Sequence, residues 1–279
     1  MMKQSRLSGP VSVTGRSFLG CCSTCVLEPT LSGIHMKLPS GRVVPLSSMH
    51  LETRGILHSL VLRCQGFALR IPEHLLGLIF ALGLDGVLIA PENFRLPYNG
   101  TAEPYWNAVE PAHRDAGNLT WYTPPESFEV VISRERWVQF LPAKPGCRSL
   151  RYEISVGYPE LGEMTIRGVV GEKTHHDQLF TARPYSSRSH MAIAGIARKC
   201  GWPHGDIGVR PAPKSARERE GVLEETCWHR QLDLLGAFMT LCPPGSRIAG
   251  TILSHRAGHV LDVELVKKML AMRKKWVRV

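Results

Sequence analysis

The sequence predicts an α+β fold built from two similar two-layer domains, residues 1–122 and 123–279. Each half of the chain begins with short β-branched runs interrupted by Gly and Pro, and each continues with helical patterns. The proline-rich stretch Thr123-Pro124-Pro125 between the halves is the best linker. A length of 279 residues suffices for two domains of ordinary size.

In the first half, the pattern changes from strand to helix at Pro72. Proline suits a first helical turn, where a missing N–H costs little, and Gly83 suits the end of the same helix. We expect, in order, mostly antiparallel strands within residues 6–45 and 55–70, an apolar helix over 72–84, a buried strand over 87–90, a turn over 94–100, and a helix early in 104–117 that runs into a polar loop.

The second half repeats this plan, because strand patterns again come first and helices follow. We expect strands over residues 128–133, 137–141, 150–156 and 164–170, helices around 175–181 and 189–199, an exposed loop over 210–221, a long amphipathic helix over 224–241, a strand over 247–253 and a basic helix over 262–277.

The formal net charge of +10 indicates an anionic partner or surface. We find no aromatic-rich RNA-binding signature and no helix-turn-helix, so no nucleic-acid partner is predicted. No apolar run reaches the roughly 18 residues of a membrane span, and no signal-peptide core follows Met1. We therefore expect a cytoplasmic monomer without an integral membrane segment, and leave peripheral contact with a membrane surface open.

The eight cysteines are scattered apart from Cys21, Cys22 and Cys25. This cluster could be a metal or redox motif, but no second Cys/His pair at zinc-finger spacing follows it. We interpret the three as small apolar residues kept reduced in a strand or bend, and the sequence assigns them no further role.

His229 and Asp233 are four residues apart in the long helix predicted over residues 224–241. At that spacing both side chains leave the same face of the helix, one turn apart. A neutral imidazole and a carboxylate so placed can share a divalent ion such as zinc. The alternative is a partly buried helix in which the two side chains hydrogen-bond each other.

Glu73 and His74 stand at the start of an otherwise apolar helix, where burying either is costly unless it is paired or binds a metal. In the functional interpretation His74 is a third ligand, and Glu73 is the base that deprotonates a metal-held water. Three protein ligands leave zinc an open catalytic position. In the alternative interpretation, both residues cap an exposed first turn, where Glu complements the helix dipole.

His259 follows Gly258 between a predicted strand and helix, so we expect it on an exposed corner near helix-terminal N–H groups. There it could act as a general acid or stabilise an oxyanion; the alternative is a surface histidine without a role. Adjacent residues diverge around a helix, so we interpret His175, His176 and Asp177 as solvated surface rather than as a metal site.

Taken in order, these segments resemble the UDP-3-O-acyl-N-acetylglucosamine deacetylase family, the zinc hydrolases of lipid A biosynthesis. The resemblance covers nearly the whole chain. It is most specific at three motifs: Pro72-Glu73-His74-Leu75-Leu76, His229-Arg230-Gln231-Leu232-Asp233-Leu234-Leu235-Gly236 and Ala257-Gly258-His259-Val260-Leu261. The family fold implies two α+β domains, each a sheet with helices, packed helix-to-helix with a zinc site at the cleft.

The resemblance also implies a role for each matching residue. His74, His229 and Asp233 would bind Zn²⁺, with Fe²⁺ as the alternative metal, and Glu73 and His259 would be catalytic. Substrate binding would fall to Arg230 and Arg256, where the family carries Lys near the nucleotide diphosphate, and to Tyr185, at the place of the acyl clamp. Arg keeps the charge that a phosphate requires.

Two departures from the family pattern concern the catalytic groups around the metal ligands. Pro184 stands where the family has a Thr that donates to the substrate, and proline has no donor. Ala237 stands where the family has the Asp that orients its catalytic His. The leading expectation is a zinc-dependent deacetylase that releases acetate from a UDP-linked acyl-amino-sugar. The alternatives are a paralogue acting on another acylated amino sugar, and a weakly active or non-catalytic ligand-binding descendant.

Overall fold

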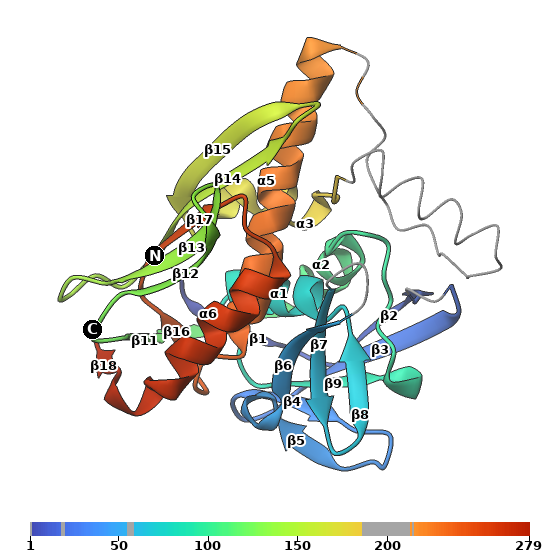
Figure 1. Ribbon diagram of the computed structural model, residues 1–279. Helices are drawn as coiled ribbons and strands as arrows, with labels where there is room; N and C mark the ends of the chain where they lie inside the picture. Colours follow the sequence, from blue (N-terminus) through green and yellow to red (C-terminus); the bar gives the residue numbers. More distant parts are fainter. Residues whose placement is uncertain (1, 18–19, 55–58, 186–212, 214) are drawn as a thin grey trace.

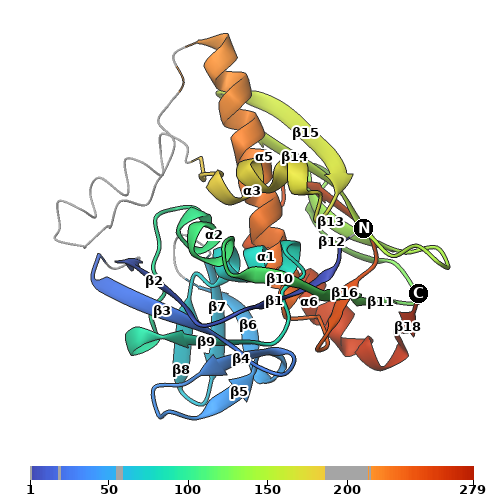
Figure 2. The same cartoon turned by 180° about the vertical axis from the view of Figure 1, so that it is seen from behind.

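The computed structural model describes residues 2–17, 20–54, 59–185, 213 and 215–279. Two five-stranded sheets lie on opposite sides of the molecule, and helices fill the space between them (Figure 1; Figure 2). This mixed α+β architecture confirms the predicted fold class. The predicted helix over residues 189–199 lies outside the described residues.

The first five-stranded sheet has the order β2-β3-β9-β4-β5. Its strands are β2 (Val11–Arg16), β3 (Cys22–Pro29), β9 (Val87–Pro91), β4 (Ile34–Lys37) and β5 (Val43–Pro45). Every neighbouring pair is antiparallel except β4 and β9. The expectation of a mostly antiparallel sheet is therefore confirmed.

The second five-stranded sheet has the order β12-β13-β17-β14-β15. Its strands are β12 (Phe128–Ser133), β13 (Arg136–Pro142), β17 (Gly250–His255), β14 (Leu150–Tyr158) and β15 (Gly162–Val169). Again one pair is parallel, β14 with β17, where the fifth strand of this sheet along the chain inserts beside the third. Both sheets therefore share one topology, in which the first, second, fifth, third and fourth strands along the chain lie side by side.

Three smaller sheets complete the described strands. One is the antiparallel sheet β6-β7-β8, another pairs β1 with β10, and in the third β11 lies between β16 and β18. Their bounds are β6 (His50–Arg54), β7 (Ser59–Cys64), β8 (Phe67–Arg70), β1 (Gln4–Leu7), β10 (His113–Gly117), β11 (Thr120–Thr123), β16 (Ser246–Ile248) and β18 (Val277–Arg278).

Five α-helices occur in the part of the chain that the structure describes: α1 (Glu73–Ala81), α2 (Glu103–Val109), α3 (His176–Thr181), α5 (Ala216–Met239) and α6 (His259–Ala271). Gly83 follows α1 at a φ of 66°, a left-handed conformation that favours glycine, so the predicted end of this helix is confirmed. None of the described helices is long and apolar enough to span a membrane.

Helices α1 and α5 cross at unusually close range, and glycine on each helix makes this possible. A Cβ on Gly77 of α1 would lie 2.4 Å from the backbone oxygen of Leu232, and a Cβ on Gly236 of α5 would lie 2.3 Å from that of Glu73. Only a residue without a side chain fits at these two points. The close crossing brings the first turn of α1 against the middle of α5.

The fully buried Arg247 of β16 fixes the far end of α1. Its guanidinium donates to the carbonyl oxygens of Ile79, Phe80 and Leu84, at 2.8, 3.1 and 2.9 Å. The last carbonyls of a helix lack partners within the helix, and a cation also complements the helix dipole there. Arg247 thereby ties a strand near the C-terminus to a helix near the N-terminus.

Four sequence predictions of local structure were wrong. Residues 113–117 form β10 rather than a polar loop, because β1 pairs with them. Residues 216–221 begin α5 rather than lie in a loop, since the Ser215 hydroxyl accepts from the Glu218 N–H and caps the helix. The single strand expected over 247–253 is two strands, with Ala249 between them. Helix α6 begins at His259 and ends at Ala271, before β18.

Candidate metal centre and active site

The first turn of α1 presents Glu73 and His74 to the middle of α5. Each is only 3% exposed, so the alternative in which they cap an exposed turn is wrong. Burying two polar side chains is costly unless they meet partners. The partners lie on α5, where His229 and Asp233 leave the same face one turn apart, as the spacing predicts.

His74, His229 and Asp233 form a compact group of nitrogen and oxygen donors. The Nε2 atom of His74 lies 3.5 Å from Oδ1 of Asp233, and Nε2 of His229 lies 3.6 Å from Oδ2 of the same carboxylate. One donor atom from each residue lies within 4.8 Å of the others. Two imidazoles and one carboxylate are a donor set that suits zinc.

The surroundings of the two histidines fit a metal ion. Nδ1 of His229 lies 3.0 Å from the carbonyl oxygen of Ala182, which can only accept, so Nδ1 carries the proton and Nε2 keeps its lone pair. The ring of His74 stacks on Tyr98 at 5.3 Å between centroids. Its buried Nδ1 has no hydrogen-bond partner among the described residues.

The electrostatics favour the protonation states that ligands require. Burial lowers the pKa of His229 to about 4, so its imidazole is neutral near pH 7. Burial alone would raise the pKa of Asp233, but the facing imidazoles of His229, His259 and His74 hold it below its ordinary value. Burial, and then the charge of Asp233, raise the pKa of Glu73 well above its ordinary value.

His259 joins the cluster from the first position of α6. Its Nε2 lies 3.7 Å from Oε1 of Glu73 and 3.6 Å from Oδ2 of Asp233. Its side chain is only 17% exposed, so the expected exposed corner is wrong, although the predicted position at a helix start is confirmed. Glu73, Asp233 and His259 also form a second group close enough to share an ion.

Arg230 reaches the same region from α5 and is tied to a residue that sequence reasoning missed. Its Nη2 donates to Oδ1 of Asp262, a fully buried carboxylate on α6. The Nε and Nη1 groups of Arg230 are buried without hydrogen-bond partners among the described residues. The only sequence signal for Asp262 is its position three residues after His259, which places both on one helix face.

Arg256 directly follows β17, the central strand of the second sheet, and makes its side-chain contacts outside the histidine cluster. Its guanidinium donates to Glu135 at 3.0 Å and lies 3.5 Å from Glu163. Its backbone has a φ of 45°, which is uncommon for a residue with a side chain and often accompanies a functional constraint. The two contacts show a cation already engaged by carboxylates.

Tyr185 lies in a separate apolar cluster between β14, β15 and α5. Its hydroxyl donates to Glu160 at 3.0 Å, and its ring packs edge-on against Tyr158 with centroids 4.8 Å apart. Pro184 precedes it, and Ala237 is fully buried in α5 one turn after Asp233. Pro184 and Ala237, the two departures from the family pattern, are therefore both among the residues that the structure describes.

The other candidate metal motifs show no sign of metal binding in the part of the chain that the structure describes. Neither the cysteine cluster nor His175, His176 and Asp177 forms a group of ligand atoms close enough to share an ion. Cys25 is buried, and burial raises the pKa of its thiol to about 12. His176 is not solvated surface as expected, because its ring packs on Trp106 at 5.6 Å and burial lowers its pKa to about 4.

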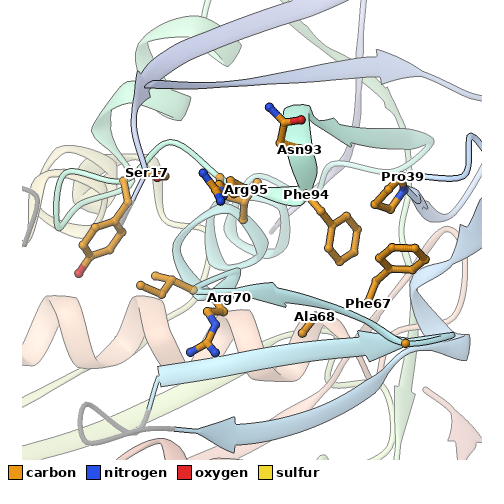
Figure 3. Close-up of a pocket in the computed structure, with 12 residues that line it drawn as sticks. Ser17, Pro39, Phe67, Ala68, Arg70, Asn93, Phe94 and Arg95 are labelled. Atoms are coloured by element: carbon orange, nitrogen blue, oxygen red, sulfur yellow. The ribbon is translucent and has the colours of Figure 1, made fainter. Parts of the chain in front are cut away.

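Tyr98, whose ring stacks on His74, is one of the residues that line a cavity of about 370 Å³. At one end the rings of Phe67 and Phe94 meet edge to face at 6.0 Å, and Arg70 and Arg95 lie nearer the opposite end (Figure 3). The cavity offers apolar and cationic surface, and Tyr98 connects it to His74.

Comparison with known proteins gives one consistent result. The family model described as LpxC, UDP-3-O-acyl N-acetylglycosamine deacetylase, matches residues 4–271. A protein of that name from Solibacter usitatus is 23% identical over 239 residues, 82% of this chain and 77% of the relative. A protein of the same name from Syntrophotalea carbinolica is 23% identical to this chain, and the match covers 99% of this chain and 90% of the relative. The Wolinella succinogenes protein is 22% identical, with 96% and 91% covered.

Proposed function

Because the chain belongs to the UDP-3-O-acyl N-acetylglycosamine deacetylase family, we propose that it is a metal-dependent deacetylase of lipid A synthesis. It removes the N-acetyl group from a UDP-linked 3-O-acyl-N-acetylglucosamine and releases acetate and a free amine. One observation carries the proposal: α1 and α5 place His74, His229 and Asp233 together, with Glu73 and His259 beside them.

His74, His229 and Asp233 would hold Zn²⁺, or Fe²⁺ as the alternative. When bound, such an ion lowers the pKa of a coordinated water to about 7 and polarises an amide carbonyl. The carbonyl oxygen of Ala182 orients His229 for this role, because it holds the proton on Nδ1. The neutral imidazoles and the ionised Asp233 are the forms that bind a cation.

Glu73 acts as the general base, because its carboxylate is buried beside the ligands, and burial together with the charge of Asp233 raises its pKa and so makes it a stronger base. It takes a proton from the attacking water while the water oxygen bonds to the amide carbon. His259 supplies the proton that the departing amine requires when the carbon–nitrogen bond breaks. Its Nε2 lies close enough to Glu73 for both to face one reacting group.

Arg230 would bind an anionic group of the substrate. Its Nε and Nη1 groups are buried and find no acceptor within the part of the chain that the structure describes. Phosphate oxygens are strong acceptors for guanidinium N–H groups, so an anionic group can accept from either of them. The nearby cavity beside Tyr98 provides room for a further part of the substrate.

We also propose that the domain boundary lies between residues 122 and 123. The first five-stranded sheet uses strands only from residues 11–91, and the second only from residues 128–255. Each half then has its own sheet of the same topology, and the helices that carry the cluster pack between the sheets.

The decisive experiment is acetate release from UDP-3-O-acyl-N-acetylglucosamine by the zinc-loaded protein. Glu73→Gln should retain about one zinc per chain and lose roughly 100–10,000-fold in turnover, because the base is removed while the ligands remain. Glu103→Gln, an exposed change in the first turn of α2, is the matched control and should keep full turnover. A zinc-loaded wild type without turnover on any acylated amino sugar overturns the proposal.

A second candidate is hydrolysis of a different acylated amino sugar by the same residues. Arg256 favours it, because Glu135 and Glu163 already engage this cation and leave it less available to a diphosphate. Turnover of the lipid A precursor should be compared with that of unacylated UDP-N-acetylglucosamine and of acylated amino sugars without UDP. Preference for a substrate without UDP supports this candidate, and absence of any turnover supports a ligand-binding descendant.

A further inference from the structure

Asp262 lies between two functional side chains, one from its own helix and one from α5. It stands in the first turn of α6, three residues after His259, and its side chain is fully buried. Oδ1 accepts a hydrogen bond from Arg230, and Oδ2 lies 3.9 Å from Nδ1 of His259. One carboxylate therefore faces a cation and an imidazole at the same time.

Nδ1 of His259 and Oδ2 of Asp262 are complementary atoms that both lack a hydrogen bond. Each is buried and without a hydrogen-bond partner among the described residues. A buried polar atom left without a partner costs about 1–3 kcal/mol, so two facing atoms of opposite character favour pairing. A small rotation of the imidazole or the carboxylate closes the 3.9 Å separation to hydrogen-bonding range.

We infer that Asp262 is a positioning residue for His259, an inference that rests on the proposed deacetylase function. By accepting the Nδ1–H of His259, Asp262 fixes the ring orientation and the tautomer. Nε2 then faces Glu73 and Asp233, where the reacting amide would bind, and it is the atom from which the protonated ring gives its proton to the departing amine. A carboxylate behind a catalytic histidine holds the ring in one tautomer without itself being protonated.

Arg230 fixes the carboxylate in turn. The ion pair is almost fully buried, with the Arg230 side chain 8% exposed and that of Asp262 fully buried, so water does not loosen it. The remaining Nε and Nη1 groups of Arg230 stay available to a substrate anion. Binding of that anion and orientation of His259 therefore depend on the same two side chains.

The family resemblance assigns no role to Asp262. The resemblance places a His-orienting Asp at the position of Ala237, and this chain has no carboxylate there. The contact of Asp262 with His259 supplies one from α6 instead of α5. In this chain the carboxylate that positions the catalytic histidine would therefore come from Asp262, and the alanine at position 237 would not leave that histidine unsupported.

The test combines imidazole nitrogen NMR with steady-state kinetics on the zinc-loaded full chain. In the wild type, the neutral His259 ring should carry its proton on Nδ1. In Asp262→Asn, the tautomers should become mixed or reversed, and kcat should fall on the order of 10–100-fold, with KM changed less than kcat and zinc content unchanged. Asp262→Glu keeps the carboxylate and should recover part of kcat and of the Nδ1–H signal.

Asp85→Asn is the matched control for a structural aspartate. Asp85 is equally buried, but it accepts from the backbone N–H groups of Gly33 and Gly245, away from the histidine cluster. This variant should lose stability and leave the tautomer of His259 and the kcat of the folded protein unchanged.

Two outcomes would overturn the inference. One is a wild-type His259 that carries its proton on Nε2, a result that needs no variant to fold. The other is a folded Asp262→Asn protein with wild-type kcat. The NMR measurement needs no substrate, so failure of the proposed deacetylase function and failure of this positioning role remain distinguishable.

Discussion

Replacing Gly236 with Ala tests whether the close crossing of α1 and α5 sets the geometry of the proposed metal site. The added Cβ would lie 2.3 Å from the backbone oxygen of Glu73 and 2.6 Å from its Cα atom. Cβ atoms essentially never approach another heavy atom within 3.0 Å, so the helices must separate by roughly 0.7 Å or more. Backbone meets backbone here, and no side chain can rotate away.

The change from Gly236 to Ala should affect both the stability of the protein and its activity. Overpacking at a tight contact costs typically about 1–3 kcal/mol in the free energy of unfolding. The separation also moves Glu73 and His74 away from Asp233, and a misplacement of about 1 Å can cost roughly 100-fold in activity. We therefore expect Gly236→Ala to lose stability, weaken zinc binding and lower turnover together.

Gly221→Ala is the matched control, because Gly221 lies in the same helix and a Cβ added there would meet no atom within 4 Å. Replacing an exposed helical glycine by alanine should stabilise the protein by up to about 1 kcal/mol. Urea unfolding gives the two free energies, and calorimetric titration gives the zinc affinities. If Gly236→Ala matched Gly221→Ala in both measurements, the crossing would not set the geometry of the site.

Three further predictions concern the contribution of Arg247 to stability, the pH dependence of stability and the effect of zinc binding. Arg247→Met should lower the free energy of unfolding by about 1–3 kcal/mol, because the buried carbonyl of Leu84 loses its donor, whereas those of Ile79 and Phe80 each keep a backbone N–H. A free energy of unfolding in urea equal to that of the wild type would contradict this estimate. Burial lowers the pKa of His176 to about 4, so the unfolded chain binds more protons than the folded chain between about pH 6.5 and 4. The free energy of unfolding should therefore decrease as the pH falls through this window. In His176→Gln, a plot of the urea midpoint against pH should have a smaller slope there. Free Zn²⁺ at 100 times its Kd should stabilise the wild type by about 2.7 kcal/mol, and equal thermal shifts in His229→Gln would argue against that ligand.

The local signals in the sequence were sufficient where one element determines the outcome. Pro72 and Gly83 bracket α1 because their backbone preferences act within one turn of the chain. The spacing of His229 and Asp233 places them on one face of α5, because helical periodicity is local. These features need no knowledge of what packs against the helix.

Features that depend on distant partners were missed for a physical reason. Residues 113–117 carry a loop-like polar pattern, yet they form β10 because residues 4–7 supply hydrogen bonds from more than 100 positions away. His259 appeared exposed because Gly258 precedes it, but Glu73 and Asp233 come from two other helices to cover it. Asp262 gave almost no signal, since its ion pair with Arg230 exists only once α5 and α6 pack.

The repeated topology has a consequence for the metal that we propose at His74, His229 and Asp233. His74 lies on a helix that follows strands of the first five-stranded sheet, whereas His229 and Asp233 precede the last strand of the second. An ion held by all three therefore links the two halves, and its binding free energy adds to the stability of their interface. The close α1–α5 crossing and Arg247 hold the same interface without metal. We therefore expect the chain to fold without zinc and the ion to tighten a preformed contact, so that metal removal lowers stability without unfolding the protein.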